Sequence, residues 1–198
     1  MKALLLIDIQ NDFLPGGALQ VPEGDRVISV ANRLMDDYDL VVATQDWHPV
    51  DHQSFASQHP GHKVGEVIVV DGLDQVLWPD HCVQGTAGAE LAGQLDRGKI
   101  DHIVTKGTDR TIDSYSGFFD NGHRKATGLG DYLAKHGVTA VDLVGLATDY
   151  CVKFTALDAV KLGLATSVIA EGVRGVELQP GDCQAAFAEM QSAGVVIQ

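Results

Sequence analysis

The sequence lacks a long apolar run, has few cysteines and is poor in basic residues. No stretch approaches the roughly 20 apolar residues that a membrane-spanning helix needs. The apolar residues near the N-terminus end at Asp8, and no small-residue cleavage site follows them. We therefore expect neither a signal peptide nor a membrane partner.

Basic side chains are outnumbered and do not cluster. Fourteen Lys plus Arg stand against 27 Asp plus Glu, which gives a formal net charge of -13. Binding to a phosphate backbone needs concentrated positive charge, so we expect no nucleic acid partner. The three cysteines, Cys82, Cys151 and Cys183, are an odd number at wide spacing. This pattern argues against a disulfide framework and favours a reducing compartment, the cytoplasm.

What the sequence does contain is an alternation of apolar runs with segments of helical period. A chain of 198 residues can bury one substantial core but is short for two, so we expect a single domain over residues 1–198. The predicted strands are residues 3–8, 40–45, 102–106, 140–145, 165–170 and 194–198, and the predicted helices are residues 22–37, 127–137, 148–163 and 182–194. Nearly continuous apolar runs are typical of parallel strands that are covered on both faces. The succession predicts a doubly wound α/β fold, with a mainly parallel six-stranded sheet between two layers of helices, as in Rossmann-like proteins.

One region does not follow this alternation. Residues 48–90 are rich in Gly, His, Pro and Asp, and they hold five of the eight histidines. Within them, residues 65–72 read "GEVIVVDG", which suits either an extra strand or a loop. We interpret the region as a long functional loop that leaves the sheet.

Polar residues stand where several predicted strands end. Asp8 closes the first strand, Asp46 and His48 follow the second, Lys106 closes the third, and "LATDYC" (146–151) follows the fourth. In open α/β sheets, ligands bind in the crevice outside the carboxyl ends of the strands. A single polar residue at such a place is usually part of a turn or a helix cap. Because several of them share one edge, the sequence predicts a functional site there.

Cys151 is the candidate nucleophile. The helical pattern of residues 148–163, with Thr148 or Asp149 as N-cap and Gly163 as the terminating residue, places Cys151 in the first turn. Unpaired N–H groups and the helix dipole favour a thiolate there, so we expect a pKa lowered from about 8.5. Cys82 and Cys183 have no such feature and are expected to be small buried residues.

A reactive thiolate also needs a proton acceptor and a neighbouring cation. Asp8 can accept the proton and Lys106 can hold the charge if both side chains point into the same crevice. The sequence alone also allows Asp8 to be part of a capping turn and Lys106 to be an exposed strand end.

The histidines suggest a metal site. Asp46 and His48 are two residues apart, so their side chains lie on the same side of an extended chain. His81, in "WPDHCVQGT", is the best third ligand. One carboxylate and two imidazoles suit Zn(II), Fe(II) or Mn(II) in an open site. Cys82 is a competing ligand, and histidines on a loop are often only solvated.

Five motifs together resemble the nicotinamidase/pyrazinamidase enzymes of the isochorismatase-like cysteine hydrolases. They are "LLIDIQNDF", "TQDWHPVDHQSFASQH", "WPDHCVQGT", "DSYSGFFDNG" and "GLATDYCVKFTALDA". The resemblance implies that nicotinamide, and also pyrazinamide, is hydrolysed to the acid and ammonia through a thioester on Cys151, in NAD salvage. It further implies that Asp8 is the general base and then acid, and that Lys106 is the cation beside the thiolate.

The resemblance also assigns the remaining parts of the site. It implies one divalent metal ion, with Zn(II) favoured over Fe(II) and Mn(II), bound by Asp46, His48 and His81. His52 is a further ligand in some relatives, whereas water takes that place in others. The family has a cis peptide before the residue at Ala147 and an oxyanion hole formed by the N–H groups of Ala147 and Cys151. The positions that match the family's ring pocket are Phe13, Leu19, Trp78, Tyr115 and Ala147.

Other functions stay open at this point. A related cysteine hydrolase could act on isochorismate, another amide or an N-carbamoyl compound. Two histidines and a carboxylate are also the ligands of non-haem Fe(II) oxygenases, although the βαβ succession and Cys151 argue against that class. A metal-binding or redox protein without enzyme activity is a further alternative. Both a monomer and a homo-oligomer agree with the sequence.

Overall fold

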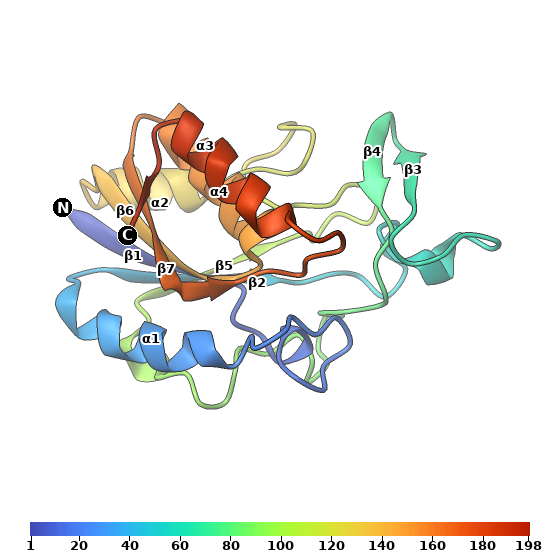
Figure 1. The fold of residues 1–198 in the computed structure, drawn as a ribbon, viewed down its shortest axis with the longest axis horizontal. Helices are drawn as coiled ribbons and strands as arrows, with labels where there is room; N and C mark the ends of the chain where they lie inside the picture. Colours follow the sequence, from blue (N-terminus) through green and yellow to red (C-terminus); the bar gives the residue numbers. More distant parts are fainter.

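A six-stranded sheet forms the centre of the molecule in a computed structural model that describes residues 1–198 (Figure 1). In spatial order its strands are β5 (His102–Lys106), β2 (Val41–Asp46), β1 (Lys2–Ile7), β6 (Ala140–Leu146), β7 (Ala165–Arg174) and β8 (Val196–Ile197). All neighbouring strands are parallel. The strand order reverses its direction at β1 and β6, which makes their carboxyl ends the place where a crevice is expected. The predicted doubly wound α/β fold is confirmed.

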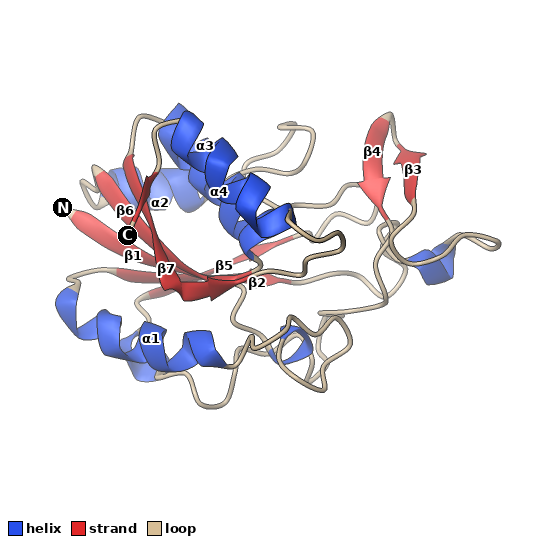
Figure 2. Cartoon of the chain, viewed as in Figure 1, coloured by secondary structure: helices blue, strands red, loops and turns tan.

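Helices cover both faces of this sheet. Helix α1 (Arg26–Leu34) lies on one face, and α2 (Leu129–Lys135), α3 (Lys153–Lys161) and α4 (Asp182–Ser192) lie on the other (Figures 1 and 2). Strand β1 supplies both cores, because Leu4 and Leu6 belong to the α1 side whereas Leu5 and Ile7 belong to the α3 side. This double coverage explains why the strand is apolar at successive positions. None of the helices is both long and apolar enough to cross a membrane.

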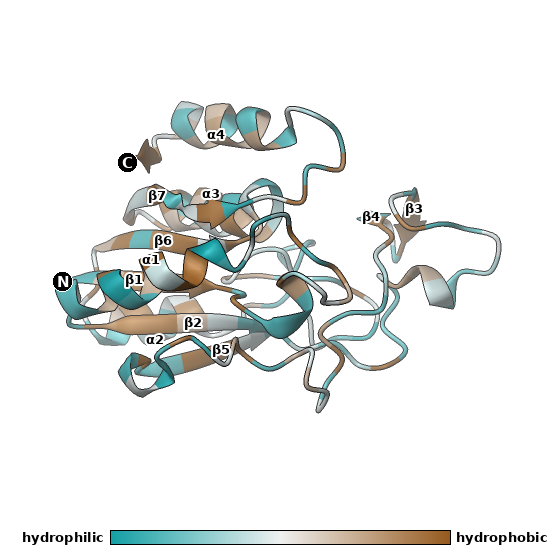
Figure 3. Cartoon of the chain, turned by 60° about the horizontal axis from the view of Figure 1, so that its bottom comes forward, coloured by the Kyte–Doolittle hydropathy of each residue, from teal (hydrophilic) through white to brown (hydrophobic).

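The buried residues of the sheet become polar toward its carboxyl edge. In Figure 3, β2 is brown over its first residues and loses that colour toward its end, where Gln45 and Asp46 stand. Both side chains are nevertheless buried. Polar side chains at the carboxyl edge of the sheet are therefore shielded from water.

Several element boundaries differ from the predicted ones. Strand β7 continues to Arg174, past a register shift opposite Leu143 and Gly145, and β8 keeps only two residues. The predicted helix at residues 148–163 begins with a π-helical turn, Thr148–Val152, before α3. The cause is a hydrogen bond from the N–H of Val152 to the carbonyl of Ala147, five residues earlier.

Residues 65–72, which suited a strand or a loop, form most of a β-hairpin. Strand β3 (Val67–Val70) pairs antiparallel with β4 (Leu73–Val76), and this two-stranded sheet projects beyond the carboxyl edge of the main sheet (Figure 1). The turn is Asp71–Gly72, with φ of 50° and 80°, which a two-residue hairpin of this type requires. Asp71 also forms an ion pair with Arg124, so the hairpin is tied to the loop that follows β5.

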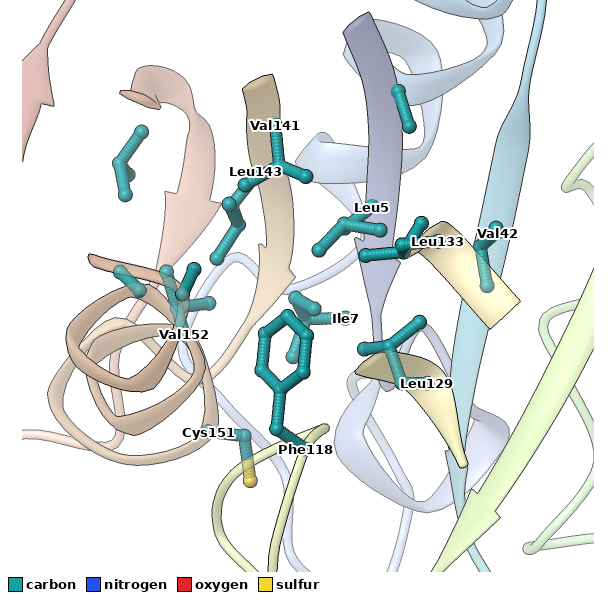
Figure 4. Close-up of a cluster of buried hydrophobic side chains, with 14 of the residues drawn as sticks. Leu5, Ile7, Val42, Phe118, Leu129, Leu133, Val141, Leu143, Cys151 and Val152 are labelled. Carbon is teal, nitrogen blue, oxygen red and sulfur yellow. The ribbon is translucent and has the colours of Figure 1, made fainter. Parts of the chain in front are cut away.

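Phe118 connects that same loop to the main core. Its side chain is 1% exposed and lies between Val152 and Leu129, close to Ile7 and Cys151 (Figure 4). The loop that carries Phe118 therefore packs against the turn that carries Cys151, the candidate nucleophile.

We expect Phe118→Ala to lower the free energy of unfolding by about 3 to 5 kcal/mol, because it leaves a cavity in a closed core. Urea denaturation followed by circular dichroism measures this change. Val69→Ala, at a side chain that is 70% exposed, is the control and should change the stability by less than about 0.5 kcal/mol. A loss below about 1 kcal/mol for Phe118→Ala would contradict this assignment of the core.

Candidate active site

Four strands bring the site together around the ammonium of Lys106. Its Nζ lies 2.9 Å from Asp8 Oδ2, donates to Asp46 Oδ1 at 2.6 Å and donates to the carbonyl of Ser114 at 2.8 Å. Cys151 Sγ is 3.4 Å away. Asp46 and Lys106 are direct partners in the register of β2 and β5, whereas Asp8 and Cys151 follow β1 and β6. The structure thus places the three predicted catalytic side chains in contact.

The charges of this cluster are stabilised by one another. Burial disfavours the ammonium of Lys106, but the carboxylates of Asp46 and Asp8 outweigh it and hold the lysine pKa well above its ordinary value. Burial likewise opposes ionisation of Asp46, but the ammonium of Lys106 acts in the opposite direction, and the Asp46 pKa stays well below its usual range. Lys106 therefore stays a cation and Asp46 an anion.

The prediction of a lowered thiol pKa at Cys151 is wrong. Burial raises the pKa of Cys151 well above its ordinary value, Lys106 acts in the opposite direction, and the negative charge of Asp8 adds to the increase. Burial also raises the pKa of Asp8, against the effects of Lys106 and of a 2.6 Å hydrogen bond from Thr44 Oγ1. The resting thiol keeps its proton, and it needs a base to become a nucleophile.

The predicted N-cap of the helix that carries Cys151 is also wrong. Neither Thr148 nor Asp149 caps the helix with its side chain, and Ala147 takes the position before the π-helical turn. Asp149 instead accepts hydrogen bonds from the N–H groups of Val176 and Glu177, at 3.0 and 2.8 Å. Its carboxylate therefore holds the segment after β7 against the Cys151 turn. An aspartate at the start of a helical pattern can either cap the helix or bind a distant segment, and the sequence does not distinguish these roles, which explains the error.

Asp46, His48 and His81 form a set that fits a metal ion. Their ligand atoms lie within 4.8 Å of one another, with Asp46 Oδ2 3.6 Å from His48 Nε2 and 3.9 Å from His81 Nε2. The Nδ1 atoms of His48 and His81 donate to the carbonyls of Gly107 and Pro79, each at 2.8 Å, because a carbonyl can only accept. In the neutral imidazole, each Nε2 therefore carries a free lone pair, as a metal ligand requires.

Three further observations support this fit. His48 Nε2 is buried without a hydrogen-bond partner. Burial lowers the pKa of His81 to about 4, which keeps its imidazole neutral and able to bind a metal. Gly107 makes room for His48, since a Cβ at this position would lie 2.4 Å from Cε1 of that ring. The donor set and its surroundings fit a divalent metal ion.

His52 lies beside His48 but outside this set. Their ring centroids are 4.3 Å apart, and His52 groups with His48 and Asp113 instead. Its Nδ1 lies 2.7 Å from Ser54 Oγ and 3.2 Å from the main-chain nitrogen of Ser54, and its Nε2 is buried without a hydrogen-bond partner. Because His52 does not belong to the set of Asp46, His48 and His81, we expect it to support these ligands from a neighbouring position.

A pocket opens directly onto Cys151 and onto two members of the metal set. It is lined by all five positions that the resemblance assigned to the ring pocket, together with Asp46, His81, Cys151, Asp113, Tyr150 and Val176. The peptide bond between Leu146 and Ala147 is cis, as the resemblance implied. The pocket thus joins a largely apolar wall to a thiol at one place and an acidic and imidazole group at another.

The sequence analysis missed several residues of this site. Asp113, which is buried, lies in the quoted motif "DSYSGFFDNG" beside Tyr115, so the motif itself could have pointed to it. Gln10 binds the main chain of Asp46 through both ends of its amide, each at 2.8 Å. Val176 and the hairpin residue Gln75 carry no sequence signal, because long loops bring them to the site.

Comparisons with known proteins agree with this geometry. The family model of the Isochorismatase domain matches residues 2–198. A nicotinamidase of Escherichia coli (strain K12) is 50% identical over 206 residues, which cover 99% of this chain and 93% of the relative. The solved structure of a nicotinamidase pyrazinamidase from Acinetobacter baumanii has a TM-score of 0.96 at 46% identity, with 99% and 94% coverage. A pyrazinamidase of Pyrococcus horikoshii in complex with zinc has a TM-score of 0.81 at 38% identity, with 100% and 98% coverage.

We expect His81→Ala to lose most of its bound metal, because it removes one of three ligands. His52→Ala should retain metal and weaken its binding by a factor of about 10, as for a residue that supports a ligand. Elemental analysis after dialysis against a fixed zinc concentration measures both, with the exposed His62→Ala as control. Equal losses in His81→Ala and His52→Ala would make His52 a ligand.

Proposed function

The chain belongs to the isochorismatase domain family, and we propose on that basis that it is a nicotinamidase, which hydrolyses nicotinamide to nicotinate and ammonia. The observation that carries this proposal is the contact of Lys106 with both Asp8 and Cys151, because Cys151 lines a pocket that Asp46 and His81 also line. The amide group of a substrate can lie next to the Cys151 thiol while its aromatic ring packs against the apolar walls of the pocket. A metal-containing amidohydrolase is the enzyme class that this arrangement serves.

The first half of the reaction forms a thioester. Cys151 Sγ attacks the amide carbon, and its proton passes to the carboxylate of Asp8. The N–H groups of Ala147 and Cys151 stabilise the negative charge on the former carbonyl oxygen, for which each donor typically contributes about 3 to 4 kcal/mol. Asp8 then returns the proton to the departing nitrogen, so ammonia leaves and an acyl group remains on sulfur.

The second half releases the acid. Asp8, ionised again, takes a proton from a water molecule whose oxygen attacks the thioester carbon. The carbon–sulfur bond breaks, the proton on Asp8 moves to the thiolate, and Cys151 is restored. The nicotinic acid that leaves loses its own proton to solvent and becomes nicotinate. Throughout both halves the ammonium of Lys106 stays between the carboxylate and the sulfur, so it stabilises whichever of them is negative.

A divalent metal ion belongs to this site, and we propose Zn(II), with Fe(II) and Mn(II) as alternatives. Asp46, His48 and His81 would hold it. When bound, the ion would supply a positive centre that attracts the ring nitrogen of the substrate. This chain's own contribution is to orient the two imidazoles through Gly107 and Pro79.

Further parts of the proposal follow from the same features. The reaction returns nicotinamide to nicotinate and so serves NAD salvage, and pyrazinamide, a ring of the same size, is a second substrate. We propose that residues 1–198 act as one domain, because four strands of one sheet build the site. Three free cysteines favour a cytoplasmic protein. The alternative substrate is another amide or an N-carbamoyl compound.

We expect the protein to release one ammonia for each nicotinamide consumed. Cys151→Ala should lower kcat by a factor on the order of 10,000 or more, since no nucleophile remains. A coupled ammonia assay with the loaded enzyme measures both. Release of ammonia from an N-carbamoyl amino acid, with none from nicotinamide, would support the alternative substrate and refute the nicotinamidase proposal.

Thr44→Val tests whether Asp8 is the base. The hydroxyl of Thr44 stabilises the carboxylate, so its loss raises the Asp8 pKa further. Because only the ionised form accepts a proton, the acid limb of the pH profile of kcat/KM should move toward higher pH, with the plateau less affected. Thr166→Val is the matched control, since this buried threonine lies in β7 and bonds only the carbonyl of Leu164. An unchanged acid limb would contradict the role of Asp8.

A further inference from the structure

Gln75 is a buried polar side chain on a hairpin that projects from the sheet. The outer face of the hairpin carries Val67 and Val69, which are 61% and 70% exposed, whereas Gln75 in β4 is 5% exposed. Its neighbour Asp74 is exposed. A buried amide is expected to make hydrogen bonds, and the contacts of this one lead to the pocket beside Cys151.

The amide nitrogen of Gln75 faces three oxygen atoms. Nε2 lies 2.7 Å from the carbonyl of Val76, 3.3 Å from Asp113 Oδ2 and 3.3 Å from the hydroxyl of Tyr115. A carbonyl and a carboxylate can only accept, so the NH2 group, and not the amide oxygen, points toward them. One hydrogen binds Val76, and the other is shared by Asp113 and Tyr115.

These two acceptors are walls of the pocket, and Gln75 is not. Tyr115 and Asp113 both line the pocket, as does Trp78, whose Nε1 donates to the Tyr115 hydroxyl at 3.2 Å. The Tyr115 oxygen thus accepts from two buried donors, one on β4 and one just after it. Asp113 lies on the metal side, with Oδ1 4.0 Å from His48 Nε2. The Gln75 amide therefore connects the aromatic wall of the pocket, Trp78 and Tyr115, to its metal side, where Asp113 lies near His48.

We propose that Gln75 is a positioning residue for the ring pocket, and that it makes the β3–β4 hairpin part of the substrate site. It acts through Tyr115 and Asp113, and it holds the aromatic wall at a set distance from the metal side. An aromatic acid or amide needs both surfaces at once, so a change at Gln75 alters ring binding before it alters bond chemistry. The choice of nicotinate as the probe rests on the proposed function.

Gln75→Met tests the inference, because methionine is close in length and has no N–H donor. We expect the Kd for nicotinate and the KM for nicotinamide to rise together by a factor of about 5 to 20, while kcat stays within about twofold. Bound metal and the rate of Cys151 alkylation should equal those of the unaltered protein. Asp74→Asn, one residue away on the exposed face, is the control and should bind nicotinate normally.

A double-mutant cycle tests the route of the effect. Tyr115→Phe keeps the ring and removes the acceptor, so it should raise the Kd for nicotinate by a similar factor even if Gln75→Met folds poorly. The double variant should bind nicotinate better than the product of the two single effects predicts, because both changes break the contact between Gln75 and Tyr115, whereas the contact of Gln75 with Asp113 is lost only with Gln75. Isothermal titration calorimetry with nicotinate measures all three.

Three outcomes would overturn the role of Gln75. They are unchanged nicotinate binding in Gln75→Met, fully additive effects in the double variant, and a parallel loss of metal, alkylation rate and kcat, which would indicate a general disturbance of the fold. The proposed function fails separately, if the unaltered protein binds nicotinate but releases no ammonia from nicotinamide.

Discussion

The buried ammonium of Lys106 is the interaction on which the rest of the site depends. A lone charge inside a protein is strongly unfavourable, and removal of one partner from a buried ion pair typically costs about 3 to 5 kcal/mol. Lys106 is fully buried and meets two carboxylates, a carbonyl and the Cys151 sulfur. Because Asp8, Asp46 and Cys151 come from three different strands or their ends, the positions of these strands and the charge balance determine one another.

Asp46 connects the two chemical tasks of the site. Its Oδ1 accepts from Lys106, whereas its Oδ2 faces the Nε2 atoms of His48 and His81. The carboxylate therefore belongs to the charge balance of the nucleophile and also to the metal set. Gln10 fixes the main chain of Asp46 from both sides. A displacement of this single residue would disturb proton transfer and ring binding together, which explains why so many polar groups support it.

Supporting residues in this protein come both from the sheet and from segments outside it. Thr44 orients Asp8 from within β2, but Asp149 holds the segment at Val176, and Gln75 reaches the pocket from a separate hairpin. Buried polar networks of this kind rigidify a site when each member has its partners. The long excursion after β2 thus provides both metal ligands and a wall of the pocket, although its own outer surface is exposed.

The sequence by itself determined the features that depend on local pattern. Apolar runs and helical periods predicted the order of strands and helices, and the ends of those runs identified Asp8, Asp46, Lys106 and the Cys151 turn as one edge. Tertiary structure alone decided the rest. The thiol pKa rises where the helix position predicted a fall, because burial raises it and Asp8, from a distant segment, adds to the increase against the effect of Lys106. The use of Gln75 likewise depends on contacts 38 and 40 residues apart along the chain, which no local period records.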